Sequence, residues 1–198
     1  MSEDAFYDIG IADVPQWVLE LPVPAVGGEL DDPWMFGDGR RLPDPGALKS
    51  RPFRDGPQRS FSVANSGRTP IANEQVARLL LQLAPDDVQV FPIHVDGADT
   101  PLYIVNATRC FACVDEGTSK EVQRYPPDGA APERAGSYRA ILGLRIDPAR
   151  VGGAQVFRIQ GYPSALIVSA TVKAALERVG NLGVCFERVT GPHELGAT

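Results

Sequence analysis

Proline and glycine interrupt the first 60 residues so often that no long helix fits there. This stretch holds eight prolines and seven glycines, and each proline removes a backbone donor that a helix needs. The same stretch carries large apolar side chains, including Trp17, Trp34 and Phe36, which a disordered tail would lack. We therefore expect short strands and loops that lie on the main body. We treat residues 1–33 as an acidic N-terminal arm and residues 34–198 as one domain.

Two later segments have the spacing of amphipathic helices. In the first, about residues 73–84, apolar side chains recur three and four positions apart behind Asn73, a residue suited to cap a helix. The second, about residues 170–179, has the same spacing, begins after Ser169 and ends at Gly180. Each pattern predicts one apolar helix face turned inward.

Strands account for most of the remaining apolar runs. In residues 138–146, apolar side chains alternate with polar or small ones, as on a strand with one wet face. Residues 115–136 are polar and rich in turn formers, so we expect a long exposed loop there. The other predicted strands span residues 88–95, 102–114, 156–159, 165–168 and 182–189. This order indicates an α+β fold, with a mostly antiparallel sheet and two helices in a single domain.

The net charge of −6 is concentrated at the beginning of the chain. Residues 1–38 contain nine carboxylates and no lysine or arginine, whereas the other 160 residues contain sixteen acids and nineteen bases. Such a surface repels nucleic acid and attracts basic partners. We therefore expect no direct binding to nucleic acid. The alternative is a solvated arm whose acids only keep the protein soluble.

The motif CFAC, at residues 110–113, is the nearest approach to a metal-binding or catalytic signature. A zinc knuckle needs its cysteines in a tight turn, and a redox pair needs them at a helix N-terminus. Here Cys110 and Cys113 lie in an apolar extended run without glycine or proline, so their side chains should point to opposite faces of a strand. We predict two core cysteines that bind no metal and take no part in catalysis.

No other pattern identifies a catalytic, cofactor or metal site. The chain has two histidines, His94 and His193, and lacks the G-x-S-x-G, H-E-x-x-H and Walker sequences. A Cys–His or Ser–His–Asp constellation assembled in space stays open. We see no signal peptide and no apolar run of membrane-spanning length. We expect a cytoplasmic protein that binds neither membranes nor cofactors.

Several segments together resemble a known bacterial family. They are WMFGDGRRL (residues 34–42), GRTPIANEQVARLLLQLAPDDVQVFPIHV (67–95), LYIVNATRCFACVD (102–115) and the closing block from VFRI to FERV (156–189). Over roughly residues 34–190 the chain resembles the immunity-protein family eleven of bacterial polymorphic toxin systems, which is well represented in myxobacteria. The matching positions are mostly core and turn residues, so they support a fold more firmly than a mechanism.

The resemblance implies a non-enzymatic antidote that binds and blocks a cognate toxin, commonly a nuclease. A nuclease cleft is basic because it holds phosphates, so a carboxylate-rich surface can occupy it. We place the toxin-binding surface on the acidic front, where aromatic and acidic residues mix: Glu29, Asp31, Asp32, Trp34, Phe36 and Asp38. Alternatively, the two aromatics only pin the arm to the sheet, and toxin binds the predicted loop at residues 115–136.

Two other kinds of protein stay open beside the antidote. One is a small cytosolic hydrolase or isomerase with a Cys/His site, which would show a cleft with perturbed titratable groups. The other is a non-catalytic regulatory module that binds a partner without affecting its catalysis. A toxin-like gene beside this one would favour the antidote.

Overall fold

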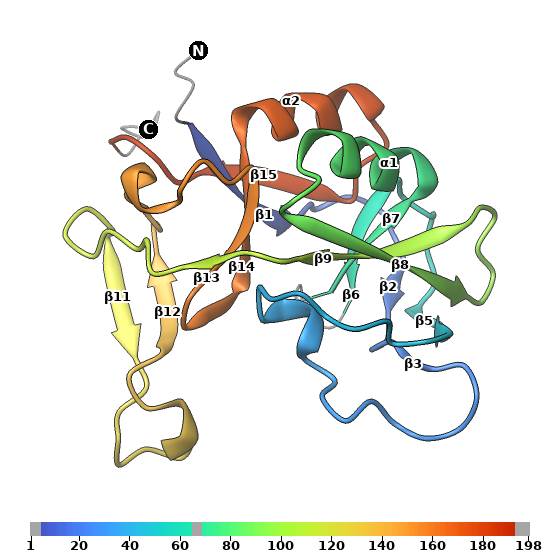
Figure 1. The fold of residues 1–198 in the computed structure, drawn as a ribbon, viewed down its shortest axis with the longest axis horizontal. Helices are drawn as coiled ribbons and strands as arrows, with labels where there is room; N and C mark the ends of the chain where they lie inside the picture. Colours follow the sequence, from blue (N-terminus) through green and yellow to red (C-terminus); the bar gives the residue numbers. More distant parts are fainter. Residues whose placement is uncertain (1–4, 65–68, 193–198) are drawn as a thin grey trace.

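Two large sheets and two α-helices form the described part of the protein. The computed structural model describes residues 5–64 and 69–192 (Figure 1). One sheet has six strands in the order β3-β4-β8-β9-β7-β6. Their bounds are β3 Val23–Pro24, β4 Leu48–Ser50, β6 Phe61–Ala64, β7 Thr69–Asn73, β8 Val88–Val95 and β9 Leu102–Ala107.

The second sheet has five strands in the order β10-β13-β14-β1-β15. Its strands are β1 Phe6–Ile11, β10 Cys110–Phe111, β13 Val156–Ile159, β14 Tyr162–Ser169 and β15 Val184–Arg188. Among the paired strands of the described residues, only β4 with β8 and β10 with β13 run parallel. The prediction of a mostly antiparallel α+β domain is therefore confirmed, with two sheets in place of one.

Within the described residues, two small sheets and three short 3-10 helices accompany the large sheets. β2 (Val18–Leu19) pairs with β5 (Pro52–Arg54). β11 (Glu121–Arg124) pairs with β12 (Tyr138–Leu142) in a hairpin. The 3-10 helices are η1 Met35–Gly37, η3 Pro132–Arg134 and η4 Pro148–Arg150.

Both predicted helices are present, and they pack side by side over the sheets (Figure 1). α1 (Glu74–Leu83) begins where the Asn73 side chain accepts a hydrogen bond from the Val76 backbone at 3.0 Å. Ser169 caps α2 (Ala170–Val179), because its side chain accepts a hydrogen bond from the Val172 backbone, and the helix ends at Gly180. The helices and both sheets share one apolar core, built from Ile9, Val76, Leu80, Val105, Val168, Val172 and Leu176 among others. This shared core makes the chain a single domain.

The beginning of the chain is more deeply integrated than an arm lying on the body. β1 is an inner strand, paired with β14 on one side and β15 on the other. The first proline is Pro15, so residues 6–11 keep every backbone donor that an inner strand needs. Phe6 and Ile9 are buried. The division between residues 33 and 34 stays a prediction.

The expectation of a long loop at residues 115–136 is wrong in part. β11 lies within it and pairs with β12, with Val122 opposite Ile141. A single apolar residue, Val122, on a short and otherwise polar strand gives no alternation that would stand out from a loop. The strand predicted for residues 138–146 ends at Leu142, because Gly143 turns the chain at a φ of 57°.

The extended run at residues 102–114 crosses from one sheet to the other. β9 belongs to the six-stranded sheet and β10 to the five-stranded sheet. Between them, the Thr108 backbone donates to the Asp87 carbonyl at 2.7 Å, and its hydroxyl donates to the Asp86 carbonyl at 2.8 Å. These bonds interrupt the strand that the sequence predicts as continuous.

Candidate functional site

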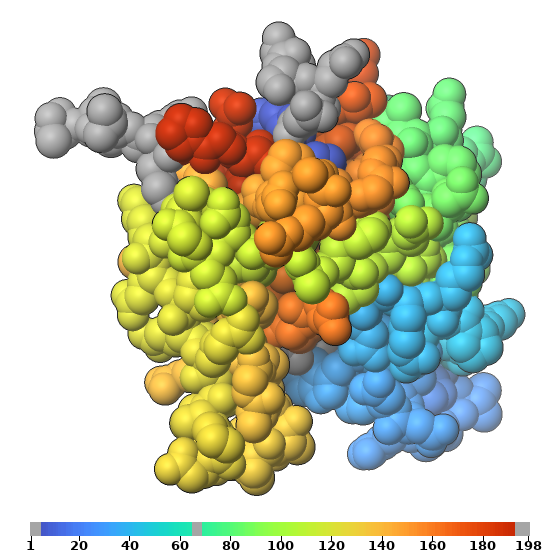
Figure 2. Space-filling model, turned by 60° about the vertical axis from the view of Figure 1, so that its left-hand side comes forward, coloured from blue at the N-terminus to red at the C-terminus, as the bar shows by residue number. Residues whose placement is uncertain are grey.

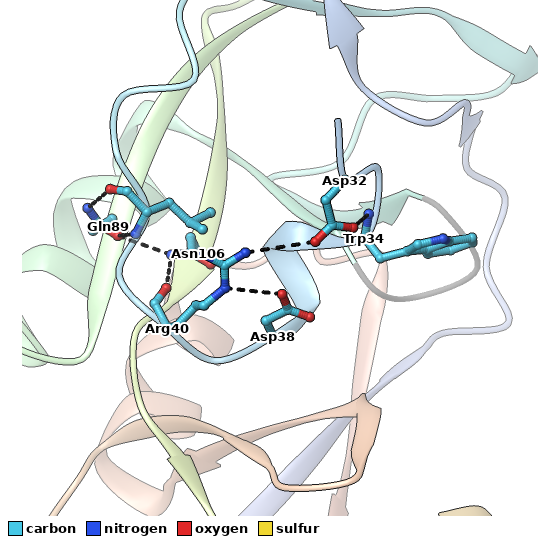
Figure 3. Close-up of polar contacts among 7 residues, drawn as sticks. Asp32, Trp34, Asp38, Arg40, Gln89 and Asn106 are labelled. Carbon is cyan, nitrogen blue, oxygen red and sulfur yellow. Dashed lines mark hydrogen bonds and ion pairs between the residues drawn. The ribbon is translucent and has the colours of Figure 1, made fainter. Parts of the chain in front are cut away.

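A tight turn built from η1 holds the acidic front. The Asp32 carboxylate accepts a hydrogen bond from the Trp34 backbone at 2.9 Å. Arg40 then reaches two acids, at 3.2 Å from Asp38 and 3.8 Å from Asp32. Figure 3 shows the guanidinium between the two carboxylates, with the Trp34 indole pointing away from them. All three charged side chains are more than a third exposed, so these ion pairs hold the turn only weakly.

The two aromatic residues of the predicted site have different roles. Phe36 is completely buried, and its ring packs against Phe91 with centroids 6.1 Å apart. It cannot contact a partner in this conformation, so its place in the predicted binding surface is wrong. Phe36 belongs to an apolar core cluster and is buried there. Trp34 is 46% exposed and is the aromatic that a partner can reach.

Two side-chain amides, half-buried Gln89 and buried Asn106, fasten the segment after the turn to the six-stranded sheet (Figure 3). Gln89 on β8 accepts from the Leu42 backbone at 2.8 Å and donates to its carbonyl at 3.0 Å. Asn106 on β9 donates to the Arg40 carbonyl at 2.9 Å. Side-chain amides mimic a backbone ladder here, so a segment without strand structure is held in a fixed position.

A buried arginine fastens the same turn to the five-stranded sheet. Arg158 on β13 is fully buried, and its Nη2 donates to the Phe36 carbonyl at 3.3 Å. Its Nη1 donates to the carbonyls of Pro163 and Ala165, at 3.2 and 3.3 Å. Gly39 lies so close to β10 and β13 that an added Cβ would come within 2.8 Å of Cys110 and 2.9 Å of Arg158. The turn is therefore locked between the two sheets.

A surface hollow of about 610 Å³ lies beside the turn. Its lining comes from three parts of the chain: Trp34, the segment around η3, and the turn between β13 and β14. We call it the Trp34 groove, lined by Trp34, Glu133, Arg134, Ala135, Ser137, Gly161 and Pro163. Figure 2 shows the segment that holds the β11–β12 hairpin, in yellow, beside the N-terminal segment, in blue, with part of the orange segment between them.

The groove brings together two surfaces that the sequence presents as alternatives. Trp34 belongs to the acidic front, and Glu133 and Arg134 belong to the predicted loop at residues 115–136. Glu29 and Asp31 are exposed in the same acidic front. The toxin-binding role of Glu29, Asp31, Asp32, Trp34 and Asp38 stays a prediction. The sequence contains no periodic signal that would pair residue 34 with residues 133–137, because their proximity depends on the whole fold.

The cysteines of the CFAC motif differ in environment. Cys113 is completely buried, as predicted, whereas Cys110 on the edge strand β10 is exposed, so its prediction as a core residue is wrong. Desolvation raises the pKa of the Cys110 thiol and raises that of Cys113 to about 11. A nucleophilic cysteine needs the opposite shift. Neither thiol is activated in this conformation.

The histidines do not complete a catalytic pair in the described part of the chain. His94 is exposed and lies 3.3 Å from the Asp96 carboxylate. His193 lies outside the described residues. Within residues 5–64 and 69–192, no group of three or more histidine, cysteine or acidic residues could hold a metal ion.

Comparison with known families gives the assignment. Residues 21–191 match the sequence profile of Imm11, an immunity protein family. The chain belongs to the Imm11 family. The match covers the whole six-stranded sheet, both helices and every strand of the five-stranded sheet except β1, and it confirms the resemblance seen in the sequence. Comparison with curated proteins finds none that matches.

The sequence analysis missed two features of this Imm11 protein. One is the groove wall at residues 133–137, whose single acid and turn residues resemble those of any surface loop. The other is Arg158. An arginine inside the apolar run VFRI is a signal of a buried, hydrogen-bonded cation, because a charge in a core strand needs partners.

Among the described helices, none is long and apolar enough to cross a membrane.

Proposed function

We propose that this Imm11 protein is a cytoplasmic antidote that binds a cognate antibacterial toxin and occludes it stoichiometrically. The observation that carries the proposal is the family match over residues 21–191. We further propose that the toxin is a nuclease with a basic cleft. The support is electrostatic: nine carboxylates and no basic residue precede position 39. Acidic surfaces of this kind attract cationic clefts and raise association rates.

The proposed contact surface is the exposed part of the acidic front. Glu29 and Asp31 face solvent, and the carboxylates of Asp32 and Asp38 are 44% and 38% exposed beside Arg40. Trp34 supplies a large, partly exposed aromatic side chain in the same segment. Interface hot spots favour such an aromatic surrounded by polar groups.

Co-expression tests the proposal directly. The toxin is the one encoded beside the gene for this chain, and it is produced in cells with or without the antidote. We expect the antidote to restore growth, and we expect a catalytically inactive form of the toxin to co-elute with it at a fixed ratio. Rescue without a complex would contradict occlusion and favour an enzyme that modifies the toxin. A complex that leaves toxin activity unchanged would favour a regulatory module.

The alternative of a Cys/His hydrolase or isomerase finds no support in the geometry. The pKa of both CFAC thiols is raised by burial, and a thiolate nucleophile would require a lowered pKa. The Imm11 assignment also favours a binding role. We propose that the protein is not an enzyme.

A further inference from the structure

We infer that a cationic hollow beside β15 binds a phosphate group. The hollow has a volume of about 450 Å³, and we call it the Arg145 hollow; its lining includes Tyr7, Lys120, Arg145, Phe186, Glu187 and Arg188. The inference goes beyond toxin binding and does not depend on it. Three observations support it: a buried arginine with unused donors, a second guanidinium close to the first, and nearby carboxylates that are engaged elsewhere.

Arg145 is a buried cation with an incomplete set of hydrogen bonds. The residue is only 7% exposed. Its Nε donates to the Gly191 carbonyl at 2.9 Å, and its Nη1 donates to the carbonyls of Leu144 and Arg188 at 2.8 and 3.0 Å. The two remaining donors, on Nη2, meet no acceptor among the described residues and stay in contact with solvent. Because neutral carbonyls replace the hydration of a cation only in part, an anion at Nη2 would stabilise this charge.

A second guanidinium lies close to the first. Gly191, whose carbonyl accepts from Arg145, has the Arg188 side chain beside it: a Cβ added to Gly191 would lie 3.6 Å from Arg188 Nη2. Lys120 adds a third cation to the lining of the hollow. Within the described residues, none of these three cations forms an ion pair. Like charges held near one another repel, and a shared anion turns that repulsion into attraction.

The one acid in the lining of the hollow, Glu187, has its side chain on the other face of the sheet. In the pairing of β1 with β15, Glu187 lies opposite Asp8, and Arg188 lies opposite Tyr7. Residues directly opposite share a face, and successive residues alternate between faces. Glu187 therefore shares a face with Asp8, and its charge contributes to the raised pKa of the Asp8 carboxyl.

An adjoining hollow of about 590 Å³ shares Arg145 and contributes two further acids. Asp147 pairs with Arg150 at 3.0 Å. Asp115 accepts hydrogen bonds from the backbone of Gly117 and Thr118 at 3.1 and 3.2 Å. The acids around the hollow thus have contacts of their own, while Lys120, Arg145 and Arg188 keep unused donors.

Phosphate matches this arrangement better than a carboxylate does. Its oxygens point in several directions, so one group can accept from two guanidiniums and an ammonium together, whereas a carboxylate offers two oxygens in one plane. Arginine and lysine are both common phosphate ligands in proteins. A dianion also neutralises more of the charge of three cations. Free phosphate and a small phosphate monoester present the same chemistry.

A titration followed by NMR tests the inference on the full-length protein. The chain, labelled with nitrogen-15, is titrated with inorganic phosphate or with glycerol phosphate at about pH 8, where both are dianions, and sodium chloride keeps the ionic strength constant. We expect saturable shifts of the Arg188 and Gly191 backbone amides, with a Kd of about 1 mM or lower. Acetate should bind at least about tenfold more weakly. Equal affinity for both phosphates would assign the site to the free ion, and tighter binding of the ester would assign it to a phosphate monoester.

Matched substitutions connect these shifts to the hollow. Lys120→Ala and Arg188→Ala remove exposed side chains and leave the buried Arg145 bonds in place, so both variants should fold. Each should weaken phosphate binding about tenfold, as expected for the loss of one charge-assisted hydrogen bond. The control is Arg139→Ala, an exposed cation outside both hollows, which should change the affinity less than about twofold.

Three results would each overturn the inference. The first is the absence of any saturable shift at the Arg188 and Gly191 amides. The second is an equal response to acetate, or to sodium chloride alone, which would show only general charge screening. The third is Lys120→Ala and Arg188→Ala variants that bind phosphate as tightly as Arg139→Ala does.

Discussion

The Arg158 guanidinium donates a hydrogen bond to the Phe36 carbonyl at 3.3 Å across 122 positions of the chain. It joins a turn that has almost no regular structure to an inner strand of the five-stranded sheet. Buried cations are costly unless their donors are satisfied. The carbonyls of Pro163 and Ala165 accept hydrogen bonds from its Nη1.

Replacing Arg158 with methionine should destabilise the fold. The change leaves three carbonyls, two of them in buried bonds, without this donor, and we expect the free energy of unfolding to fall by about 3 kcal/mol. Urea denaturation followed by circular dichroism measures it. The control is Arg139→Met on the exposed part of β12, which should cost less than about 0.5 kcal/mol. Equal stability of the two variants would show that the Arg158 bonds contribute little.

Gly39 should tolerate no side chain, for two separable reasons. Its φ is +69°, and a Cβ there would meet Cys110 at 2.8 Å and Arg158 at 2.9 Å. Gly46 has a similar φ of +76° but nothing within 4 Å of an added Cβ. We expect Gly46→Ala to cost about 1 kcal/mol from backbone strain alone and Gly39→Ala to cost at least about 2 kcal/mol more. Thermal unfolding of the pair compares them, and equal costs would argue against the close approach.

Stability should depend on pH through Asp8. Desolvation raises the pKa of this carboxyl from 3.8 to about 7, against the opposing effects of the Leu166 backbone donor and Arg158; Glu187 adds to the rise. Between about pH 4 and pH 7, the folded state keeps a proton that the unfolded state has lost. The free energy of unfolding therefore falls as pH rises through this window, by at most about 4 kcal/mol.

Asp8→Asn should remove that dependence. Its amide oxygen can still accept from the Leu166 backbone, which donates to Asp8 at 3.1 Å. We expect the variant to be more stable than wild type at pH 8 and closely similar below pH 4, measured by denaturation at each pH. Asp99→Asn, at an exposed site, is the control. A wild-type profile with the same slope as the Asp8→Asn profile would contradict the assignment.

Charge reversal should slow association with the toxin. Asp32 also caps the turn at Trp34, so Glu29→Lys with Asp31→Lys is a cleaner change than one that includes Asp32. We expect a lower association rate and a weaker dependence of that rate on salt, because the screening length is about 10 Å at 0.1 M. Stopped-flow measurements at low and high salt test this. An unchanged salt slope in the folded variant would place the binding surface away from the acidic front.

The CFAC cysteines should be dispensable for protection. Cys113→Ala removes a buried side chain and should cost about 1 kcal/mol, whereas Cys110→Ala is at an exposed site and should cost less than about 0.5 kcal/mol. Cells carrying the double variant should survive the toxin as wild type does. Loss of protection by a folded double variant would reopen a thiol-based mechanism.

Local sequence patterns predict the elements of this fold that depend on local forces. The caps Asn73 and Ser169 and the apolar spacing behind them specify both helices, and alternation specifies β8. The positions that depend on distant partners are the ones missed. β1 reads as part of an arm because its pairing with β14 and β15 brings together opposite ends of the chain.

The candidate site divides in the same way. An exposed acidic front follows from the distribution of charge, but the sequence does not distinguish Phe36 from Trp34, because the two aromatics lie in one short turn. Packing against Phe91 buries the first, and the second stays 46% exposed. The groove depends on three distant segments and therefore on the assembled sheets.

The β11–β12 hairpin is a two-stranded unit of its own, outside both large sheets. Substitutions near η3 would therefore alter one side of the groove while the strand pairing of both sheets stayed intact. Trp34 lines the other side of the groove. Its turn is held in place by two nearby hydrogen bonds, one from Arg158 to the Phe36 carbonyl and one from the Leu42 backbone to Gln89. Under the predicted toxin-binding role of this surface, substitutions in the hairpin can change the residues that meet a partner while the pairing of both large sheets is kept.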